Sequence, residues 1–213
     1  MITVYSYRWV PDFARGLARD LRVRWALEEA GLDYQEWLIG LGDDQNSPAY
    51  RACQPYGQIP AYEEGGLVMF ESGAIVLHIG EKSEALLPTD PKARARATCW
   101  LFSALNTIEP VIQELASIDL FHADQAWAKE RRPQVEAQAK KRLAELAKAL
   151  GDKDYLEGEF TIGDLMMATV LQIPRQTDIV AGEPNLRAYL DRCEARPAFQ
   201  RALRDQLASF VDT

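Results

Sequence analysis

Residues 54–73 read Gln-Pro-Tyr-Gly-Gln-Ile-Pro-Ala-Tyr-Glu-Glu-Gly-Gly-Leu-Val-Met-Phe-Glu-Ser-Gly. Two short apolar runs, Ala61-Tyr62 and Leu67–Phe70, flank the Glu-Glu-Gly-Gly segment. Paired glycines adopt positive φ angles without steric cost, which is typical of a hairpin turn. The stretch therefore predicts two antiparallel strands joined by a turn at 63–66.

Pro60 stands directly before the first of these apolar runs. Proline has no backbone N–H, so it belongs at a strand start, and X–Pro is the bond in which the cis form costs least. One interpretation is an ordinary edge-strand proline. We favour a cis Ile59–Pro60 bond, which turns the Ile59 backbone outward and leaves its N–H and C=O free to pair with an extended ligand.

This stretch resembles the glutathione-binding half of the glutathione transferase family, of the bacterial, cytosolic type. The family pattern is roughly Asn-Pro-x-Gly-Lys-Val-Pro-x-Leu, then a hairpin, then Glu-Ser at a helix start. The matching pieces here are Gln54–Tyr62 and Glu71-Ser72. Gln58 stands where lysine is common in the family. The resemblance therefore implies that a neutral hydrogen bond replaces one ion pair to the bound peptide.

Glu71 and Ser72 open an apolar helix pattern. One interpretation is a plain helix N-cap with an acidic neighbour. In the other, the hydroxyl and backbone N–H of Ser72 bind a carboxylate at the helix N-terminus, and Glu71 binds an ammonium group. An α-amino acid end carries both charges on one carbon, so adjacent receptors suit a γ-glutamyl group. The nearby Ile59-Pro60 pair favours this second interpretation.

Hydrophobic periodicity predicts the other elements of the N-terminal half. Strands are expected at Ile2–Tyr7 and Tyr34–Ile39, and helices at Ala14–Ala30, Pro48–Ala52 and Ser72 to about Ala85. Gly31 is the expected stop of the first helix. In the family, the piece that corresponds to Arg22–Leu32 forms this helix. The order βαβ and then ββα is the thioredoxin-like arrangement, with a mixed sheet.

The segment 83–92 contains two prolines and several turn formers, so it predicts a linker. Everything after it is helical, with helices expected at Ala93–Leu120, Asp124–Leu150, Asn185–Ala195 and Pro197–Ser209. Bends are expected near Pro110 and Pro133. Thr161-x-x-Asp164 fits a capping box, which in the family starts a buried helix. The predicted fold is an α/β thioredoxin-like N-terminal domain (1–82) plus an all-α C-terminal domain (93–213), the glutathione transferase fold.

A net charge of −8 argues against nucleic acid or an anionic membrane as the main partner. No segment approaches the ~20 apolar residues of a membrane span. Met1–Tyr5 starts as a strand and not as a signal peptide. The cysteines Cys53, Cys99 and Cys193 are odd in number and widely spaced, so we expect free thiols and a cytoplasmic location. No His/Cys/Asp cluster has metal-ligand spacing, so no metal is expected.

The loop after the first strand is the expected source of the thiol chemistry. An unperturbed thiol titrates at about 8.5, so a hydroxyl or a positive dipole must stabilise a thiolate near neutral pH. In the family this donor is a Tyr, Ser or Cys at the end of the first strand or the start of the first helix. Here the expected helix begins Ala14-Arg-Gly-Leu-Ala-Arg, without hydroxyl or thiol. Counting back from Arg15-Gly16-Leu17 to the tyrosine of tyrosine-type members lands on Pro11, which indicates an insertion.

The candidates for the missing donor are Tyr5, Ser6, Tyr7 and Trp9. Strand alternation places Tyr5 and Tyr7 on one face of the sheet and Ser6 on the other. Tyr7 lies nearest to the carboxyl edge of the sheet and is the first choice as the catalytic donor. The helix N-terminus together with Arg15 or Arg19 is the alternative thiolate stabiliser.

The leading hypothesis is a glutathione transferase, in which the thiolate of bound glutathione attacks a small hydrophobic electrophile. The resemblance implies a glutathione site formed by Gln58, Ile59, Pro60, Glu71 and Ser72, and a substrate pocket with Trp9, Trp100, Ser103, Asn106 and Thr107. The residues assigned to catalysis, from their place on the strand and in the loop, are Tyr7 and Arg15. It also implies a homodimer. The alternatives are a glutathione-dependent isomerase or peroxidase of the same fold, and a non-catalytic glutathione-binding or interaction protein.

Overall fold

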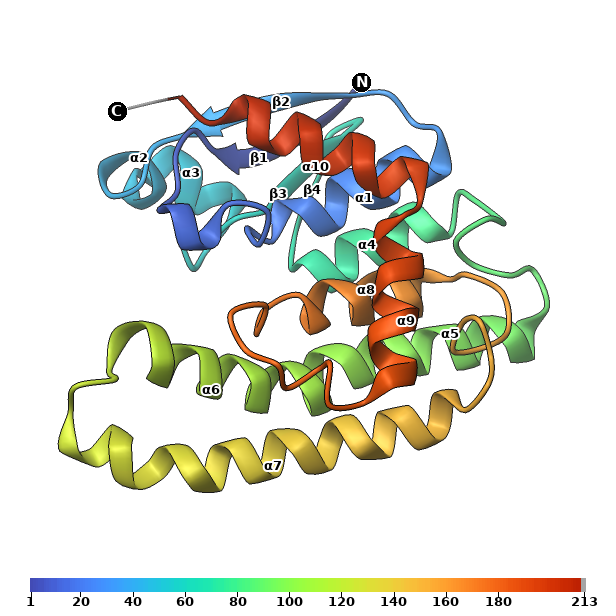
Figure 1. Ribbon diagram of the computed structural model, residues 1–213. Helices are drawn as coiled ribbons and strands as arrows, with labels where there is room; N and C mark the ends of the chain where they lie inside the picture. Colours follow the sequence, from blue (N-terminus) through green and yellow to red (C-terminus); the bar gives the residue numbers. More distant parts are fainter. Residues whose placement is uncertain (212–213) are drawn as a thin grey trace. The chain divides into compact units, whose positions relative to one another are not determined.

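The chain divides into two compact units in the computed structural model, which describes residues 1–211. The sheet unit comprises Met1–Leu87 and the residues from Ala195 onward, and the helical unit comprises Pro88–Glu194. Figure 1 shows the elements of both units in the colours of the sequence. The division falls between Leu87 and Pro88, inside the segment predicted as a linker.

A four-stranded mixed sheet with the order β2-β1-β3-β4 is the centre of the sheet unit. Its strands are β1 (Ile2–Tyr7), β2 (Tyr34–Ile39), β3 (Ala61–Glu64) and β4 (Leu67–Phe70). β1 pairs parallel with β2 and antiparallel with β3, and β3 pairs antiparallel with β4. This topology confirms the predicted thioredoxin-like arrangement.

Helices cover both faces of this sheet. The helices of the sheet unit are η1 (Asp12–Ala14), α1 (Asp20–Ala30), α2 (Asp43–Asn46), α3 (Pro48–Cys53), α4 (Ser72–Gly80) and α10 (Pro197–Ser209). α1 lies on the face that carries Ser6, because the Arg24 guanidinium of α1 donates to the Ser6 hydroxyl at 3.1 Å. On the opposite face, Tyr50 of α3 joins a buried cluster against which Tyr5 and Tyr7 pack.

α10 belongs to the sheet unit because it packs along α1, as Figure 1 shows. Arg196 pairs with Glu29 at 2.6 Å, and the rings of Phe199 and Trp25 lie 4.8 Å apart, edge to face. The sequence placed this helix within the domain 93–213. Hydrophobic spacing identifies a helix and its apolar side, but it does not identify the partner that covers that side.

The first helix starts later than predicted. A helix from Ala14 is wrong, because α1 begins at Asp20 and only the short 3₁₀ helix η1 precedes it. Gly16 has a φ of 75°, a left-handed conformation that interrupts a right-handed helix. The end of the helix is as predicted, since Gly31 is its left-handed C-cap with a φ of 65°.

The hairpin turn is shorter than predicted. Glu63 and Glu64 belong to β3, so only Gly65 and Gly66 form the turn, with φ angles of 57° and 87°. A two-residue turn with both φ angles positive matches the twist of the strands it joins. The helix after it also ends earlier, at Gly80.

The helical unit consists of α5 (Pro91–Ser103), η2 (Ala104–Ile108), α6 (Glu109–Phe121), α7 (Ala126–Leu150), α8 (Ile162–Leu171) and α9 (Pro184–Glu194). The π-helical turn η2 ends at Ile108, just before the start of α6, where Pro110 has no N–H to bond the carbonyl of Asn106. The expected bend therefore takes the form of a wider turn, whereas α7 continues through Pro133. Across residues 1–211, no helix combines the length and apolar character needed to cross a bilayer.

The predicted capping box is present at the start of α8. The Thr161 hydroxyl accepts the Gly163 N–H at 3.1 Å, and the Asp164 carboxylate accepts the Thr161 N–H at 2.9 Å. Asp164 is fully buried, and it also accepts the Leu156 N–H at 2.8 Å and the Tyr189 hydroxyl at 3.0 Å. Burial raises the pKa of Asp164, and these donors act in the opposite direction. One carboxylate therefore joins α8, the loop before it and α9.

Replacement of this carboxylate tests its structural role. Asp164→Ala leaves several buried donors without an acceptor, each worth about 1–3 kcal/mol, so we expect unfolding free energy to fall by about 3 kcal/mol or more. Denaturant unfolding of the full chain measures the loss. Glu159→Ala, an exposed carboxylate in the same loop, is the control and should change stability by less than about 0.5 kcal/mol. Equal stability of the two variants contradicts the buried capping role.

Candidate functional site

The N-terminus of α4 combines an exposed carboxylate with a buried hydroxyl. Glu71 is exposed, and Ser72, the first residue of the helix, is 6% exposed. Glu71 has a φ of 70°, which is unusual for a residue with a side chain. Such backbone strain costs about 1–3 kcal/mol and gathers at ligand sites. The first N–H groups of a helix have no intrahelical acceptor, so this end of α4 can bind an anion.

Arg22 of α1 is a site residue that the sequence did not single out. It is 3% exposed, and its Nη1 donates to the Ser72 Oγ at 3.3 Å. Because this bond uses a lone pair of the oxygen, the Ser72 hydroxyl hydrogen remains available for another acceptor. The sequence contains one signal for this role, which is that Arg22 is a charged residue inside the apolar helix pattern. That pattern does not show which element lies opposite Arg22.

The loop between α3 and β3 is fixed by buried polar groups. Gln54, which is 2% exposed, accepts the N–H groups of Tyr56 at 2.7 Å and Gln58 at 3.2 Å. The Tyr50 hydroxyl donates to the Gln58 carbonyl at 2.6 Å. These bonds hold the Gln58 backbone and leave its side chain exposed. Gln54 and Tyr50 shape the site without having been predicted as part of it.

The Ile59–Pro60 bond is cis, as the sequence predicts. Pro60 is buried, and Ile59 is 9% exposed within the cluster on the Tyr7 face of the sheet. Within residues 1–211, no hydrogen bond engages the Ile59 backbone. Its N–H and C=O can therefore pair with the backbone of an extended ligand.

Tyr7 packs against the same cluster as Ile59. Its hydroxyl donates to Gln45 Oε1 at 2.9 Å, and burial raises the pKa of Tyr7. The phenol is therefore a neutral donor near neutral pH. One O–H donates to one acceptor at a time, so a bond from Tyr7 to a ligand sulfur requires exchange with Gln45.

The two other strand candidates are engaged elsewhere. The Tyr5 hydroxyl donates to Glu63 at 3.1 Å, and burial together with this carboxylate raises the pKa of Tyr5 to about 12. Ser6 lies on the opposite face and accepts from Arg24. The strand alternation predicted from the sequence is confirmed: Tyr5 and Tyr7 both pack against the cluster that contains Ile59, and Ser6 lies on the other face.

The loop from Arg8 to Arg19 carries no hydroxyl or thiol side chain. Trp9 is half-buried there. The Arg15 guanidinium pairs with Asp12 at 3.3 Å and lies 5.8 Å from the centre of the Phe210 ring. Arg15 is thus a cation held between a carboxylate and an aromatic face.

Four of the predicted substrate-pocket residues belong to the helical unit. Ser103 ends α5 and is half-buried, whereas Asn106 and Thr107 are exposed on η2. The Trp100 indole N–H donates to Glu157 at 2.8 Å, so its polar edge already has a partner. Trp9, the fifth, belongs to the sheet unit.

Metal-ligating groups do not cluster in the part of the chain that is described: no three His, Cys, Asp or Glu side chains of residues 1–211 could hold a metal ion. The His78 ring lies 3.3 Å from Glu64 at the side of α4. The polar groups at the start of α4 and the open Ile59 backbone instead suit an organic zwitterion with a peptide backbone.

Comparison with known proteins identifies the family. The domain described as glutathione S-transferase, N-terminal, matches residues 13–81, and the corresponding C-terminal domain matches residues 102–197. Glutathione S-transferase 3 of Zea mays is 33% identical, with 86% of this chain and 87% of the relative covered. The disulfide-bond oxidoreductase YfcG of Escherichia coli is 31% identical, with 83% and 86% covered.

A solved structure supports the same assignment. The glutathione transferase of Burkholderia graminis, with two glutathione molecules bound per subunit, superimposes with a TM-score of 0.83 at 26% identity. The match covers 95% of this chain and 87% of that one. The domain matches, the maize relative and this fold agree: the chain belongs to the glutathione S-transferase family.

Proposed function

We propose that this protein transfers the thiol of glutathione to a small hydrophobic electrophile. The observation that carries the proposal is the juxtaposition of Glu71 and Ser72 at the start of α4, where an exposed carboxylate precedes a buried hydroxyl and unpaired helix N–H groups. These are neighbouring receptors for an ammonium group and a carboxylate. The γ-glutamyl end of glutathione carries both groups on one carbon.

In the proposed complex, the Glu71 carboxylate accepts from the γ-glutamyl ammonium. The Ser72 hydroxyl and N–H donate to the γ-glutamyl carboxylate. Arg22 donates to the Ser72 hydroxyl oxygen and so orients the hydroxyl. The cysteinyl backbone of glutathione forms hydrogen bonds with the N–H and C=O of Ile59. The ligand backbone thus pairs with the protein backbone in the way that an added β-strand does. The exposed Gln58 side chain reaches the remaining peptide, and Pro60 fixes the turn.

We assign thiol activation to Tyr7 and Arg15. The thiol releases its proton to solvent on binding. The thiolate then forms a bond from sulfur to the electrophilic carbon, and the bond to the leaving group breaks, with that group taking the bonding pair. The Tyr7 phenol donates a hydrogen bond to the sulfur, and the Arg15 cation favours the anion. Trp9, Trp100, Ser103, Asn106 and Thr107 are the proposed substrate-pocket residues.

The alternative to this proposal is a second class of reaction at the same site. A relative at 31% identity is named a disulfide-bond oxidoreductase, so redox use of glutathione is the alternative within this fold. A non-catalytic binding protein is the third possibility. We further propose a cytoplasmic location, which suits the free thiols of Cys53, Cys99 and Cys193.

Two substitutions test the binding site. Ser72→Ala and Glu71→Ala each remove a charge-assisted hydrogen bond, so we expect each to weaken glutathione binding about tenfold to a hundredfold. The double variant should show no binding by calorimetry. Glu84→Ala, an exposed carboxylate of the same unit, is the control and should bind like the unmodified protein. Retained affinity in a folded double variant rules out this assignment.

Tyr7→Phe tests the chemistry. Loss of one donor to a charged sulfur is worth about 1.5–3 kcal/mol, so the pKa of the bound thiol should rise by roughly one to two units. Turnover near neutral pH should slow about tenfold to a hundredfold, in proportion to the lost thiolate. Glutathione affinity should change little, because the γ-glutamyl contacts remain. Thiolate absorbance measured against pH gives the result, with Tyr5→Phe as the matched control.

If the thiol titrates identically in Tyr7→Phe, stabilisation of the thiolate is assigned to Arg15 and the helix N-terminus. Arg15→Leu then tests the contribution of Arg15 directly. If the unmodified protein binds glutathione but shows no thiolate below a pH of about 8, the bound thiol is unperturbed. That result contradicts the transferase proposal and favours a non-catalytic binding protein.

The edge strand β4 supports a homodimer. Its apolar side chains Leu67, Val68 and Phe70 are 46%, 42% and 38% exposed, and Tyr56 beside Phe70 is 64% exposed. Uncovered apolar edges favour association. We expect sedimentation to show a dimer, and Val68→Lys should shift the protein toward monomer. A monomer at all concentrations contradicts this proposal.

A further inference from the structure

The C-terminal segment Gln206–Val211 contacts both ends and the middle of the loop between β1 and α1. Gln206 Nε2 donates to the Ala18 carbonyl at 3.1 Å, near the end of the loop. The Val211 N–H donates to the Arg8 carbonyl at 3.0 Å, at its beginning. Between them, the Phe210 ring centre lies 5.8 Å from the Arg15 guanidinium.

The loop's internal bonds do not fix its position. They run from Ala14 N to Pro11 O at 2.8 Å and from Leu17 N to Ala14 O at 2.9 Å, so each spans a single turn. Such bonds shape the turns.

At its two ends the loop is attached to the sheet, because the Arg8 N–H donates to the Ile39 carbonyl at 2.9 Å and Ala18 packs against the cluster that contains Ile39. The contacts from Gln206–Val211 add to these attachments. A loop of this kind needs contacts with distant segments to hold one geometry.

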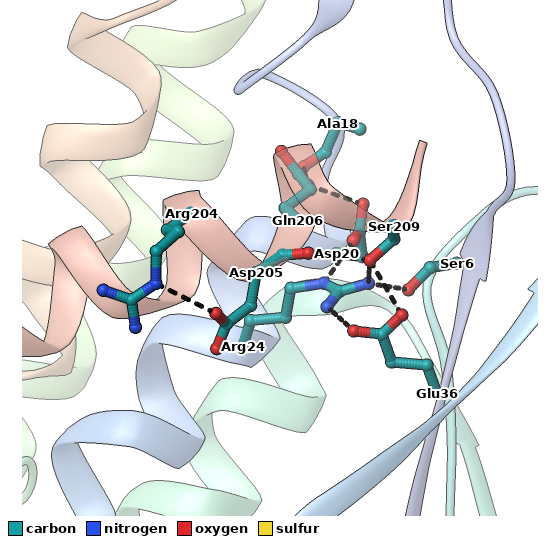
Figure 2. Close-up of polar contacts among 9 residues, drawn as sticks. All are labelled: Ser6, Ala18, Asp20, Arg24, Glu36, Arg204, Asp205, Gln206 and Ser209. Carbon is teal, nitrogen blue, oxygen red and sulfur yellow. Dashed lines mark hydrogen bonds and ion pairs between the residues drawn. The ribbon is translucent and has the colours of Figure 1, made fainter. Parts of the chain in front are cut away.

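The segment itself starts from a buried polar network, shown in Figure 2. Gln206 is fully buried and also donates to Asp20 at 2.9 Å. Asp20 in turn accepts from Arg24 at 2.7 Å, and Arg24 donates to Ser209 at 3.4 Å. The end of α10 is therefore anchored on α1 before the chain reaches Phe210.

We propose that Gln206–Val211 is a positioning element for the reactive loop, in which Phe210 orients the Arg15 cation and Gln206 holds the turn at Ala18. The proposal rests on the function assigned above, because it takes Arg15 as a thiolate-stabilising group. An aromatic face attracts a cation and restricts its position. The segment is thus a determinant of thiol activation that lies outside the glutathione-binding residues.

The Gln206–Val211 segment should affect turnover and not glutathione affinity. Gln58, Ile59, Glu71 and Ser72 lie on other elements and have no hydrogen bond to Gln206–Val211 within residues 1–211. Loss of the aromatic ring should therefore leave glutathione affinity unchanged. It should lower kcat and raise the pKa of the bound thiol.

Phe210→Leu is the test variant, because it keeps apolar bulk and removes the ring. Phe210→Trp keeps an aromatic face and should restore the original behaviour. Arg204→Ala, at an exposed residue of α10, is the matched control. Hydrogen exchange of the Ala14–Ala18 amides, thiolate titration and steady-state kinetics are measured on the full chain of each variant.

For Phe210→Leu we expect at least threefold faster exchange in Ala14–Ala18, a higher pKa of the bound thiol and at least a threefold lower kcat. The dissociation constant of glutathione should stay within twofold. Gln206→Leu should accelerate exchange at Ala18 as well. Unchanged loop exchange in both variants overturns the proposal, and so does faster exchange with an unchanged thiol titration and kcat.

The experiment distinguishes this proposal from the proposed function. If the unmodified protein forms no thiolate, the transferase function fails. The exchange of Ala14–Ala18 then still decides, by itself, whether the segment positions the loop. If the unmodified protein forms a thiolate and Phe210→Leu titrates identically, the transferase function stands and the positioning role is refuted.

Discussion

A guanidinium without solvent contact has to find all its hydrogen-bond acceptors inside the protein, and Arg24 is fully buried. Burial lowers the pKa of Arg24, but Asp20 and Glu36 more than offset this effect and raise it overall. The acceptors come from α1 itself, from Ser6 of β1, from Glu36 of β2 and from Ser209 of α10 (Figure 2). The hydrogen bonds of this one side chain thus require α1, β1, β2 and α10 to lie in defined positions relative to one another.

Opposite sides of α1 perform different tasks. Asp20 and Arg24, one turn apart, face β1 and α10, whereas Arg22 reaches Ser72 at the start of α4. The helix that is locked to the sheet is therefore also the helix that supports the anion receptor. A shift of α1 along its axis would disturb the polar network and the proposed glutathione site together, because Arg24 and Arg22 belong to the same helix.

Recognition and chemistry depend on different kinds of structure here. The proposed receptor for the γ-glutamyl group uses the N-terminal end of α4, and the proposed contacts to the peptide backbone use the loop that buried Gln54 holds. The residues assigned to the thiol lie on or beside the loop that follows β1, where Tyr7 is bonded to Gln45 and Arg15 to Asp12.

The features that follow from local geometry could be predicted from the residue pattern. Strand alternation placed Tyr7 and Ser6 on opposite faces, Gly31 ended the first helix, and the Thr161 and Asp164 box began α8. Each follows from a steric preference or a hydrogen bond between residues a few positions apart, so the pattern of residue types is sufficient.

Contacts between groups far apart in the chain could not be predicted in this way, because they depend on how the whole chain packs. Arg22 faces Ser72 across a sequence separation of 50, and Gln206 faces Asp20 across 186. The sequence shows that α10 has an apolar side but does not show which element that side packs against. In the structure it packs against α1. Even the start of α1 depended on Gly16 adopting a φ of 75° within a loop held from outside. Periodicity reports that a side is buried, but the partner is chosen by the packing of the whole chain, where many elements compete for each apolar and polar surface.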